Sequence, residues 1–189
     1  MRKILKENSE IFHGQGFKKL GSEQAPPFFT SAVFIDIQAY LGRAMTSDEE
    51  ISVDDLIGAL RKQGLSEDDI KEGDVVLYNT GWGDLWKTDN KKFNMSSPGL
   101  SMEAGDWLVN KKVVLVGTDN WSVESIPGSN KKNFAGNHQK FLVENGIYII
   151  ENMDFQKLRE AKVYRFAFSF GAIPYKGATG SPARPFALY

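Results

Sequence analysis

His138 and Glu151 carry side chains that can ligate a metal ion or move a proton, and they flank the stretch NHQKFLVENGIYIIE. The pattern predicts a short helix that begins at His138 and is capped by Asn137, a stop at Gly146, and a buried strand that ends at Glu151. A carboxylate at the end of an apolar strand needs a hydrogen bond, a cation or a metal ion, or else it keeps its proton. The helix, turn and strand could bring His138 to this carboxylate. The spacing alone favours a salt-bridged strand end with a surface histidine over a metal or catalytic pair.

A second group of candidate residues follows two other apolar runs. The run GDVVLYNTGWG predicts a buried strand over residues 75–79 and a glycine-flanked loop that carries Trp82 and Trp86. Such indoles are typical of a wall for a flat substrate, and equally typical of a lid packed on the core. The run KVVLVGTDNW ends in Asp119, and ligands of open α/β sheets collect beyond the carboxyl ends of strands. Asp119 is therefore a candidate substrate-binding residue, with an Asx-turn residue as the alternative.

The candidate residues must be positioned by secondary structure, and strand and helix signals alternate along the chain. Ser52, with Asp55 three residues later, predicts a capped helix over residues 53–63 that Gly64 ends. Ser101 predicts a second capped helix, over residues 101–110. The other elements are predicted as strands over residues 31–40, 112–121, 147–150, 163–174 and the C-terminal end, and a helix over residues 154–162. The order indicates an α/β fold with a mixed sheet, in one domain that covers residues 1–189 and starts with an irregular segment over about residues 1–20.

Composition excludes several classes of function. The 189 residues carry a formal net charge of −1, so we expect no nucleic-acid or membrane partner. No apolar run is long enough to span a bilayer, and the first residues lack the apolar core of a signal peptide. Zero cysteines exclude disulfides, a thiolate nucleophile and a cysteine-based zinc site. A cytoplasmic location is the default expectation.

Four stretches, in their order and spacing, resemble one known family: GDVVLYNTGWGDLW, PGLSMEAGDWLVNKKVVLVGTDNWSVESIP, NHQKFLVENGIYIIENM and GATGSPARPFAL. This is the putative cyclase family, which includes kynurenine formamidase, isatin hydrolase and related metal-dependent hydrolases of amides, lactones and lactams. The resemblance runs from Phe12 to the C-terminus. It implies a compact fold of the swivelling β/β/α type and assembly as dimers or larger oligomers.

The resemblance also implies a metal site. In the family a divalent ion, Zn²⁺ or Mn²⁺, activates water, and most of its ligands come from an N-terminal stretch of the form His-x-Gly-Thr-His-x-Asp, with a further catalytic His a few residues on. The remaining ligands are a His and a Glu that match His138 and Glu151, and this match reverses the interpretation from spacing alone. The N-terminal motif is absent from the sequence, and residues 1–11, where it would end, contain no histidine.

The incomplete ligand set leaves two hypotheses open. The first is a short form that binds Zn²⁺ or Mn²⁺ weakly or not at all and has little or no hydrolase activity. The second is a truncated version of an active hydrolase of aromatic or cyclic amides. A third ligand could come from His13, Asp36 or Asp119, although nothing in the spacing demands it. The expected partners are a second copy of the chain, in a homodimer, and a small aromatic ligand.

Overall fold

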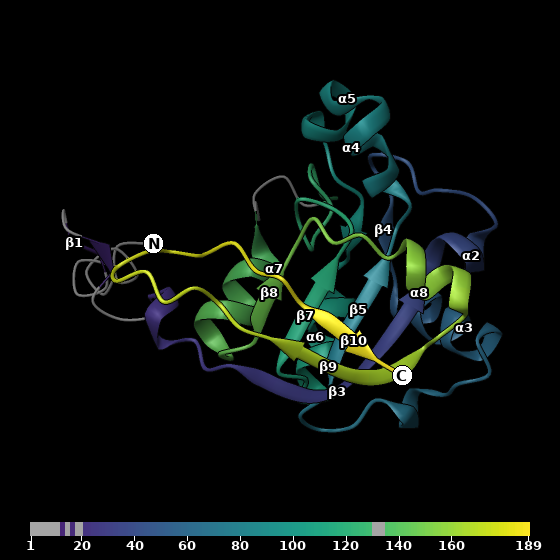
Figure 1. Cartoon of the computed structure of the whole chain (residues 1–189). Helices are drawn as coiled ribbons and strands as arrows, with labels where there is room; N and C mark the ends of the chain where they lie inside the picture. Colours follow the sequence, from purple (N-terminus) through teal and green to yellow (C-terminus); the bar gives the residue numbers. More distant parts are fainter. Residues whose placement is uncertain (1–11, 14–15, 18–20, 130–134) are drawn as a thin grey trace. The chain divides into compact units, whose positions relative to one another are not determined.

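Four parallel strands form the part of the fold that positions the candidate residues. The computed structural model describes residues 12–13, 16–17, 21–129 and 135–189. The parallel strands lie in the order β3 (Phe28–Asp36), β5 (Val75–Asn79), β7 (Leu115–Thr118) and β8 (Tyr148–Ile150). Their arrowheads point the same way in Figure 1. Residues that follow these strands therefore meet at one edge of the sheet, where open α/β sheets hold their ligands.

The chain divides into two compact units, a central unit (Ser31–Phe166) and a terminal unit (Met1–Thr30 with Ala167–Tyr189). In the central unit every residue of β5 and β7 is buried, as expected for apolar strands covered on both faces. Helices α3 (Val53–Lys62) and α6 (Met102–Asn110) contribute Leu60 and Leu108 to the same apolar cluster as Val76 and Val116 of these strands. Packing on the sheet therefore fixes the framework around the strand ends.

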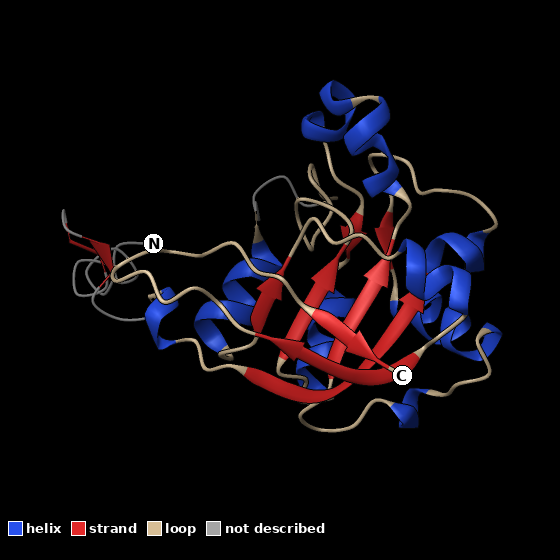
Figure 2. Ribbon diagram, viewed as in Figure 1, coloured by secondary structure: helices blue, strands red, loops and turns tan. Residues whose placement is uncertain are grey.

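The remaining elements of the central unit are short, and Figure 2 shows the helical ones in blue, joined by loops. They are the helices α2 (Ile37–Leu41), α4 (Leu85–Thr88), α5 (Asn90–Met95), α7 (Gly136–His138) and α8 (Gln156–Ala161), the π-helix Gln139–Glu144, the 3-10 turns Glu67–Asp69 and Trp82–Asp84, and the parallel pair β4 (Glu50–Ile51) and β6 (Gly99–Leu100).

The terminal unit holds antiparallel pairs. Strand β1 (Phe12–His13) pairs with β2 (Gly16–Phe17), and a 3-10 turn covers Ser22–Gln24. Strand β10 (Phe186–Leu188) pairs with β9 (Arg165–Phe170), whose first two residues belong to the central unit. The large sheet has the order β10-β9-β3-β5-β7-β8, so the predicted α/β fold with a mixed sheet is confirmed. Within the described residues, no helix has both the length and the apolar character needed to cross a membrane.

Capping signals in the sequence located two helices correctly. The Ser52 hydroxyl accepts the Asp55 amide and the Asp55 carboxylate accepts the Ser52 amide, which is the predicted capping box of α3. The Ser101 hydroxyl accepts the Ala104 amide at the start of α6. Gly64, in the left-handed region at φ 77°, follows α3 as predicted.

Several local predictions were wrong. The strands predicted over residues 112–121 and 163–174 are shorter in the structure, where β7 covers Leu115–Thr118 and β9 covers Arg165–Phe170. The strand predicted over residues 31–40 stops at Asp36, because this carboxylate accepts the Ala39 amide and so starts helix α2. Asn137 does not cap the helix of His138, since Ala135 is the capping residue there. Asn137 is instead fully buried inside α7 and donates to the carbonyls of Leu100 and Ser101.

Candidate functional site

His138 and Glu151 lie side by side in the central unit. The Nε2 atom of His138 is 3.4 Å from Oε1 of Glu151, and the same oxygen accepts the backbone amide of Val123 at 3.1 Å. Helix α7 and the π-helix present the histidine, and β8 ends directly before the glutamate. The connection ends at Gly146, whose φ of 64° fits the left-handed stop expected from the sequence.

Glu124 completes this cluster, although no feature of the sequence singled it out as a site residue. Its Oε2 lies 2.7 Å from Nδ1 of His138, and its carboxylate is 7% exposed. Because a carboxylate only accepts, Nδ1 carries a proton in this bond, and Nε2 faces Glu151. The Ser122 hydroxyl and the His138 amide also donate to Glu124. The three side chains therefore form a chain of contacts from Glu124 through His138 to Glu151.

Burial and charge perturb both ends of the His138–Glu151 contact. Burial raises the pKa of Glu151 to about 7, although the charge of His138 and the Val123 amide act in the opposite direction. Burial lowers the pKa of His138, but the hydrogen bond from Nδ1 and the negative charges of Glu124 and Glu151 outweigh it and leave the pKa raised. The pair therefore tends to hold a proton near neutral pH, which is how the glutamate at the strand end is accommodated.

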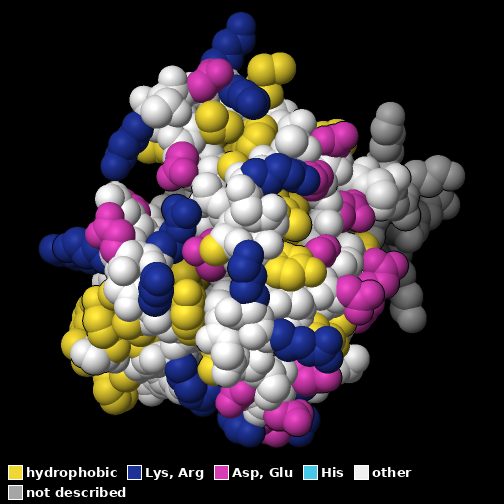
Figure 3. All heavy atoms as spheres, turned by 90° about the vertical axis from the view of Figure 1, so that its right-hand side faces the viewer, with side chains coloured by type: hydrophobic (Ala, Val, Ile, Leu, Met, Phe, Trp, Pro, Cys, Tyr) yellow, Lys and Arg dark blue, Asp and Glu magenta, His cyan; other side chains and the backbone are white. Residues whose placement is uncertain are grey.

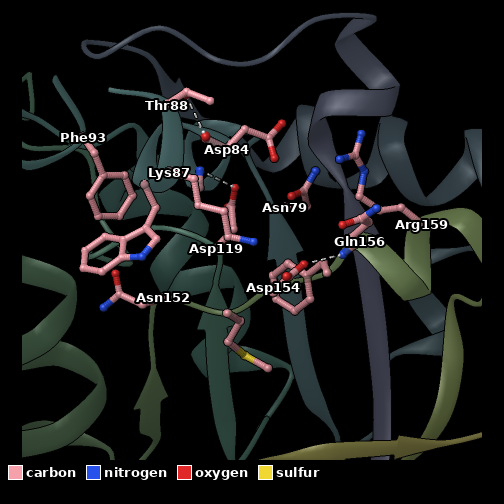
Figure 4. Close-up of a pocket in the computed structure, with 14 residues that line it drawn as sticks. Asn79, Asp84, Lys87, Thr88, Phe93, Asp119, Asn152, Asp154, Gln156 and Arg159 are labelled. Carbon is pink, nitrogen blue, oxygen red and sulfur yellow. Dashed lines mark hydrogen bonds between the residues drawn. The ribbon is translucent and has the colours of Figure 1, made fainter. Parts of the chain in front are cut away.

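A pocket of about 740 Å³ opens at the carboxyl ends of the parallel strands. Its lining includes Asn79 at the end of β5, Asp119 just after β7 and Asn152 just after β8. Figure 4 shows these side chains together in one close-up. Glu124, His138 and Glu151 are not among its lining residues. The pocket and the His138 cluster are therefore separate features of the same sheet edge.

The two tryptophans take different places. Trp86 lines the pocket, is 56% exposed and lies edge-on to Phe93 with ring centroids 5.4 Å apart. Trp82 is 2% exposed, and its indole N–H donates to the Phe93 carbonyl. The interpretation as a pocket wall therefore fits the position of Trp86, whereas Trp82 has the position of a core-packed lid.

Asp119 faces the pocket but is engaged by the protein itself. Its Oδ1 accepts the amide and the hydroxyl of Thr80 at 2.8 and 2.9 Å, and its Oδ2 accepts the Gly83 amide at 3.0 Å. Burial raises the pKa of this carboxyl, and these hydrogen bonds oppose the shift. Asp119 therefore holds the loop that follows β5 against the end of β7.

Comparison with known proteins gives the family. A family model described as a putative cyclase matches residues 11–125, which is 115 of the 189 residues. The chain belongs to the putative cyclase family. A comparison with curated proteins found no match. The matched segment includes Glu124 and Asp119 and ends before His138, so the assignment of His138 and Glu151 rests on the resemblance of their local sequence.

Solved structures of cyclase-type proteins share the fold. A crystal structure of a protein described as a novel cyclase has a TM-score of 0.82 at 24% identity, and covers 96% of this chain and 61% of its own. Isatin hydrolase A from Ralstonia solanacearum has a TM-score of 0.66 at 21% identity, covering 88% and 63%. A protein described as a predicted metal-dependent hydrolase from Bacillus stearothermophilus has a TM-score of 0.60 at 20% identity, covering 89% and 72%. The chain thus spans less than two thirds of the first two, and these identities show the fold alone.

In this cyclase-family chain, His138 and Glu151 fit two ligand positions of a metal site. Two ligands that each lie about 2.0–2.1 Å from a tetrahedral ion are roughly 3.3–3.4 Å apart. The 3.4 Å between Nε2 of His138 and Oε1 of Glu151 agrees with that separation and is long for a hydrogen bond. Glu124, bound to Nδ1, takes the position of the carboxylate that typically orients a metal-ligating histidine.

His138 and Glu151 do not make up a complete metal site. Within the described ranges, no group of three or more His, Cys, Asp and Glu side chains could hold a metal ion. Asp36 caps α2 and pairs with Arg159 at 3.2 Å, and Asp119 is bound by Thr80 and Gly83. His13 lies in β1, and its side chain is outside the described part of the chain.

Proposed function

We propose that this chain carries part of a cyclase-type metal-hydrolase site, with His138 and Glu151 as ligands and Glu124 as the residue that orients the histidine. As written, the chain binds Zn²⁺ or Mn²⁺ weakly or not at all and hydrolyses amides or lactams slowly or not at all. The observation that carries the proposal is the 3.4 Å donor pair, which stands without a third ligand among the described residues.

Ligand count is the physical reason for weak binding. A catalytic zinc ion usually has three protein ligands and one open position for water. The whole sequence holds two histidines and no cysteine, so the only other histidine that this chain can supply is His13. An ion held by two ligands keeps most of its water and gains little over solution. A metal-bound water that is not strongly polarised keeps a high pKa and remains a poor nucleophile at neutral pH.

The side chains can still transfer a proton. Glu124 fixes Nδ1 as the protonated nitrogen of His138, and Glu151 has a pKa of about 7, within the range of a general base at neutral pH. A general base alone contributes a modest part of a hydrolytic rate enhancement, since water must still be activated and the developing oxyanion stabilised. The cluster by itself is therefore expected to support little turnover.

The alternative function is that of an active Zn²⁺- or Mn²⁺-dependent hydrolase of an aromatic or cyclic amide, of which this sequence is a piece. The observation that favours it is length, because the chain spans 61–64% of the first three structures that it matches. The DNA directly upstream of the Met1 codon separates the two functions. An in-frame His-x-Gly-Thr-His-x-Asp supports the active hydrolase, whereas an in-frame stop codon supports the short form.

Metal content tests the proposal directly. Protein purified without chelator is expected to contain well under one equivalent of Zn²⁺ and Mn²⁺, and to show no hydrolysis of N-formylkynurenine or isatin above background. The matched variants are His138→Ala and His13→Ala, which remove one histidine each. Near-stoichiometric metal that His138→Ala abolishes together with turnover would overturn the proposal, and the remaining ligand would then be sought at His13, Asp36 and Asp119.

A further inference from the structure

The pocket at the strand ends has an aromatic side. Trp86 is exposed there and packs edge-on against Phe93, and Met153 and Phe155 add apolar surface to the lining. An exposed indole can gain a stacked or edge-on contact with another aromatic ring, and such contacts are favourable. The volume of about 740 Å³ lies within the range of small-molecule sites. This side of the pocket suits a ligand with one or two aromatic rings.

Arg159 lies on the opposite side. In Figure 4 Phe93 and Arg159 stand at opposite ends of the cavity, and Asn79 and Asp119 lie between them. The Arg159 side chain is 31% exposed, and its Nε donates to Oδ2 of Asp36 at 3.2 Å. Within the described part of the chain, the side-chain hydrogen bonds of Arg159 involve Nε alone. The two terminal nitrogens therefore keep donors for a ligand.

Asp36 makes this arginine a fixed rather than a mobile cation. The Asp36 carboxylate is 6% exposed and also accepts from the Ala39 amide and from Nδ2 of Asn79. A guanidinium held at Nε presents its remaining N–H groups in a planar fork that matches a carboxylate. Asp36 is thus a positioning residue for Arg159.

The other charged side chains that line the pocket do not cancel the attraction of Arg159 for a carboxylate ligand. Lys87 adds a second cation, whereas Asp84 and Asp154 add carboxylates. Oδ1 of Asp154 already accepts the Gln156 amide, and the Asp119 carboxylate is bound by Thr80 and Gly83. Asp84 remains as a carboxylate that would favour a ligand with an additional positive group, so a zwitterion belongs among the probes.

We propose that this pocket binds a small aromatic carboxylate, with the ring against Trp86 and the carboxylate on the terminal nitrogens of Arg159. The inference does not rest on the proposed metal site, since the pocket and the His138 cluster share no lining residue. Binding requires neither metal nor turnover, so the failure of one proposal leaves the other standing.

Calorimetric titration with matched probes tests the inference. The probes are 2-naphthoate, its neutral counterpart 2-naphthamide, and tryptophan as the zwitterion. Wild-type protein is expected to bind 2-naphthoate about tenfold more tightly than 2-naphthamide, because only the acid makes charge-assisted bonds with Arg159. Tryptophan should bind at least as well as 2-naphthoate if Asp84 receives the ammonium group.

Variants assign the two contacts. Arg159→Gln should weaken 2-naphthoate about tenfold and leave 2-naphthamide unchanged, which removes the preference for the acid. Trp86→Ala should weaken both probes to the same degree, by about threefold to tenfold. The control is Lys112→Gln, whose cation pairs with Glu72 outside the pocket and should not affect either probe.

Three results would overturn the inference: no binding of 2-naphthoate at millimolar concentration, equal binding of acid and amide by the wild-type protein, or equal weakening of both by Arg159→Gln. If Arg159→Gln does not fold because Asp36 loses its partner, the acid-to-amide ratio of wild type and Trp86→Ala decides. The inference is supported if both proteins bind the acid more tightly than the amide by the same ratio and Trp86→Ala binds both probes more weakly. A ratio of one in the wild-type protein overturns it.

Discussion

At the scale of the residue, Asp119 shows how a candidate binding carboxylate can be occupied by the fold. It receives amide and hydroxyl donors from Thr80 and an amide from Gly83. Asp119→Asn keeps the size of the side chain but turns one oxygen into an N–H donor that faces another donor. We expect this change to lower the free energy of unfolding by about 1–3 kcal/mol, measured by urea denaturation.

Asp84→Asn is the matched control for Asp119→Asn. Asp84 lines the same pocket but is exposed, so its substitution should change the unfolding free energy by less than about 0.5 kcal/mol. If Asp119→Asn is as stable as Asp84→Asn, the Asp119 carboxylate is free for a ligand and the structural interpretation given above is wrong.

The candidate site was predictable only in part, and Glu124 shows why. His138 and Glu151 were visible from their residue types and from the resemblance to the cyclase family. Glu124 stands in the polar run Ser-Val-Glu-Ser, which has no feature that distinguishes a buried carboxylate from a solvated one. Its role arises from a contact across 14 residues with Nδ1 of His138, and such tertiary contacts leave no local pattern.

At the scale of the element, the sequence predicted best where local chemistry decides the structure. The capping residues Ser52 and Ser101 marked α3 and α6, and the apolar run over residues 75–79 is β5. Helices α4 and α5 were not predicted, because their short sequences LWKT and NKKFNM carry no clear apolar period. The strand over residues 31–40 was drawn too long because β-branched and aromatic residues continue past Asp36, whose cap is the stronger signal.

The segment that joins α2 to β4 provides a pH-dependent prediction. Glu49 binds Arg43 through both carboxylate oxygens and accepts the Thr46 amide, and the Arg43 hydrogen bond is the main cause that lowers the pKa of Glu49 to about 2. A folded-state pKa below the ordinary value of 4.5 stabilises the fold above pH 4.5, and this contribution is lost as the pH falls toward 2. Because about half of Arg43 is exposed, solvent screening reduces the effect to about 1 kcal/mol.

The measurement is the difference in unfolding free energy between wild type and Glu49→Gln at pH 7 and at pH 2.5. The wild type should be more stable by about 1 kcal/mol at pH 7, and the difference should shrink at pH 2.5. Arg43→Ala should remove most of the same pH-dependent difference. A difference that is equal at both pH values would show that the pair does not couple to folding.

At the scale of the whole molecule, exposed apolar side chains are concentrated in the terminal unit. Six of the ten large hydrophobic side chains that are exposed among the described residues belong to it: Phe29, Ile173, Tyr175, Phe186, Leu188 and Tyr189. Figure 3 shows one face of the molecule, on which hydrophobic side chains form a patch at the lower left and also lie at the top and near the middle. Strand β10 is an edge strand of the sheet, and edge strands with apolar side chains are prone to pair with another chain.

We expect these features to make the protein a homodimer through the β10 edge. Phe186 and Leu188 are two residues apart and therefore share a face, so an antiparallel pair of β10 strands would bring the same side chains of both copies together. Light scattering at micromolar concentration should give a mass near twice 21.1 kDa, and Phe186→Lys with Leu188→Lys should restore the monomer because like charges would meet across the interface. Val143→Lys, which changes an exposed apolar residue of the central unit, is the control and should remain dimeric. A wild-type mass of one chain, or a dimer that the double substitution leaves intact, would show that β10 is not the interface.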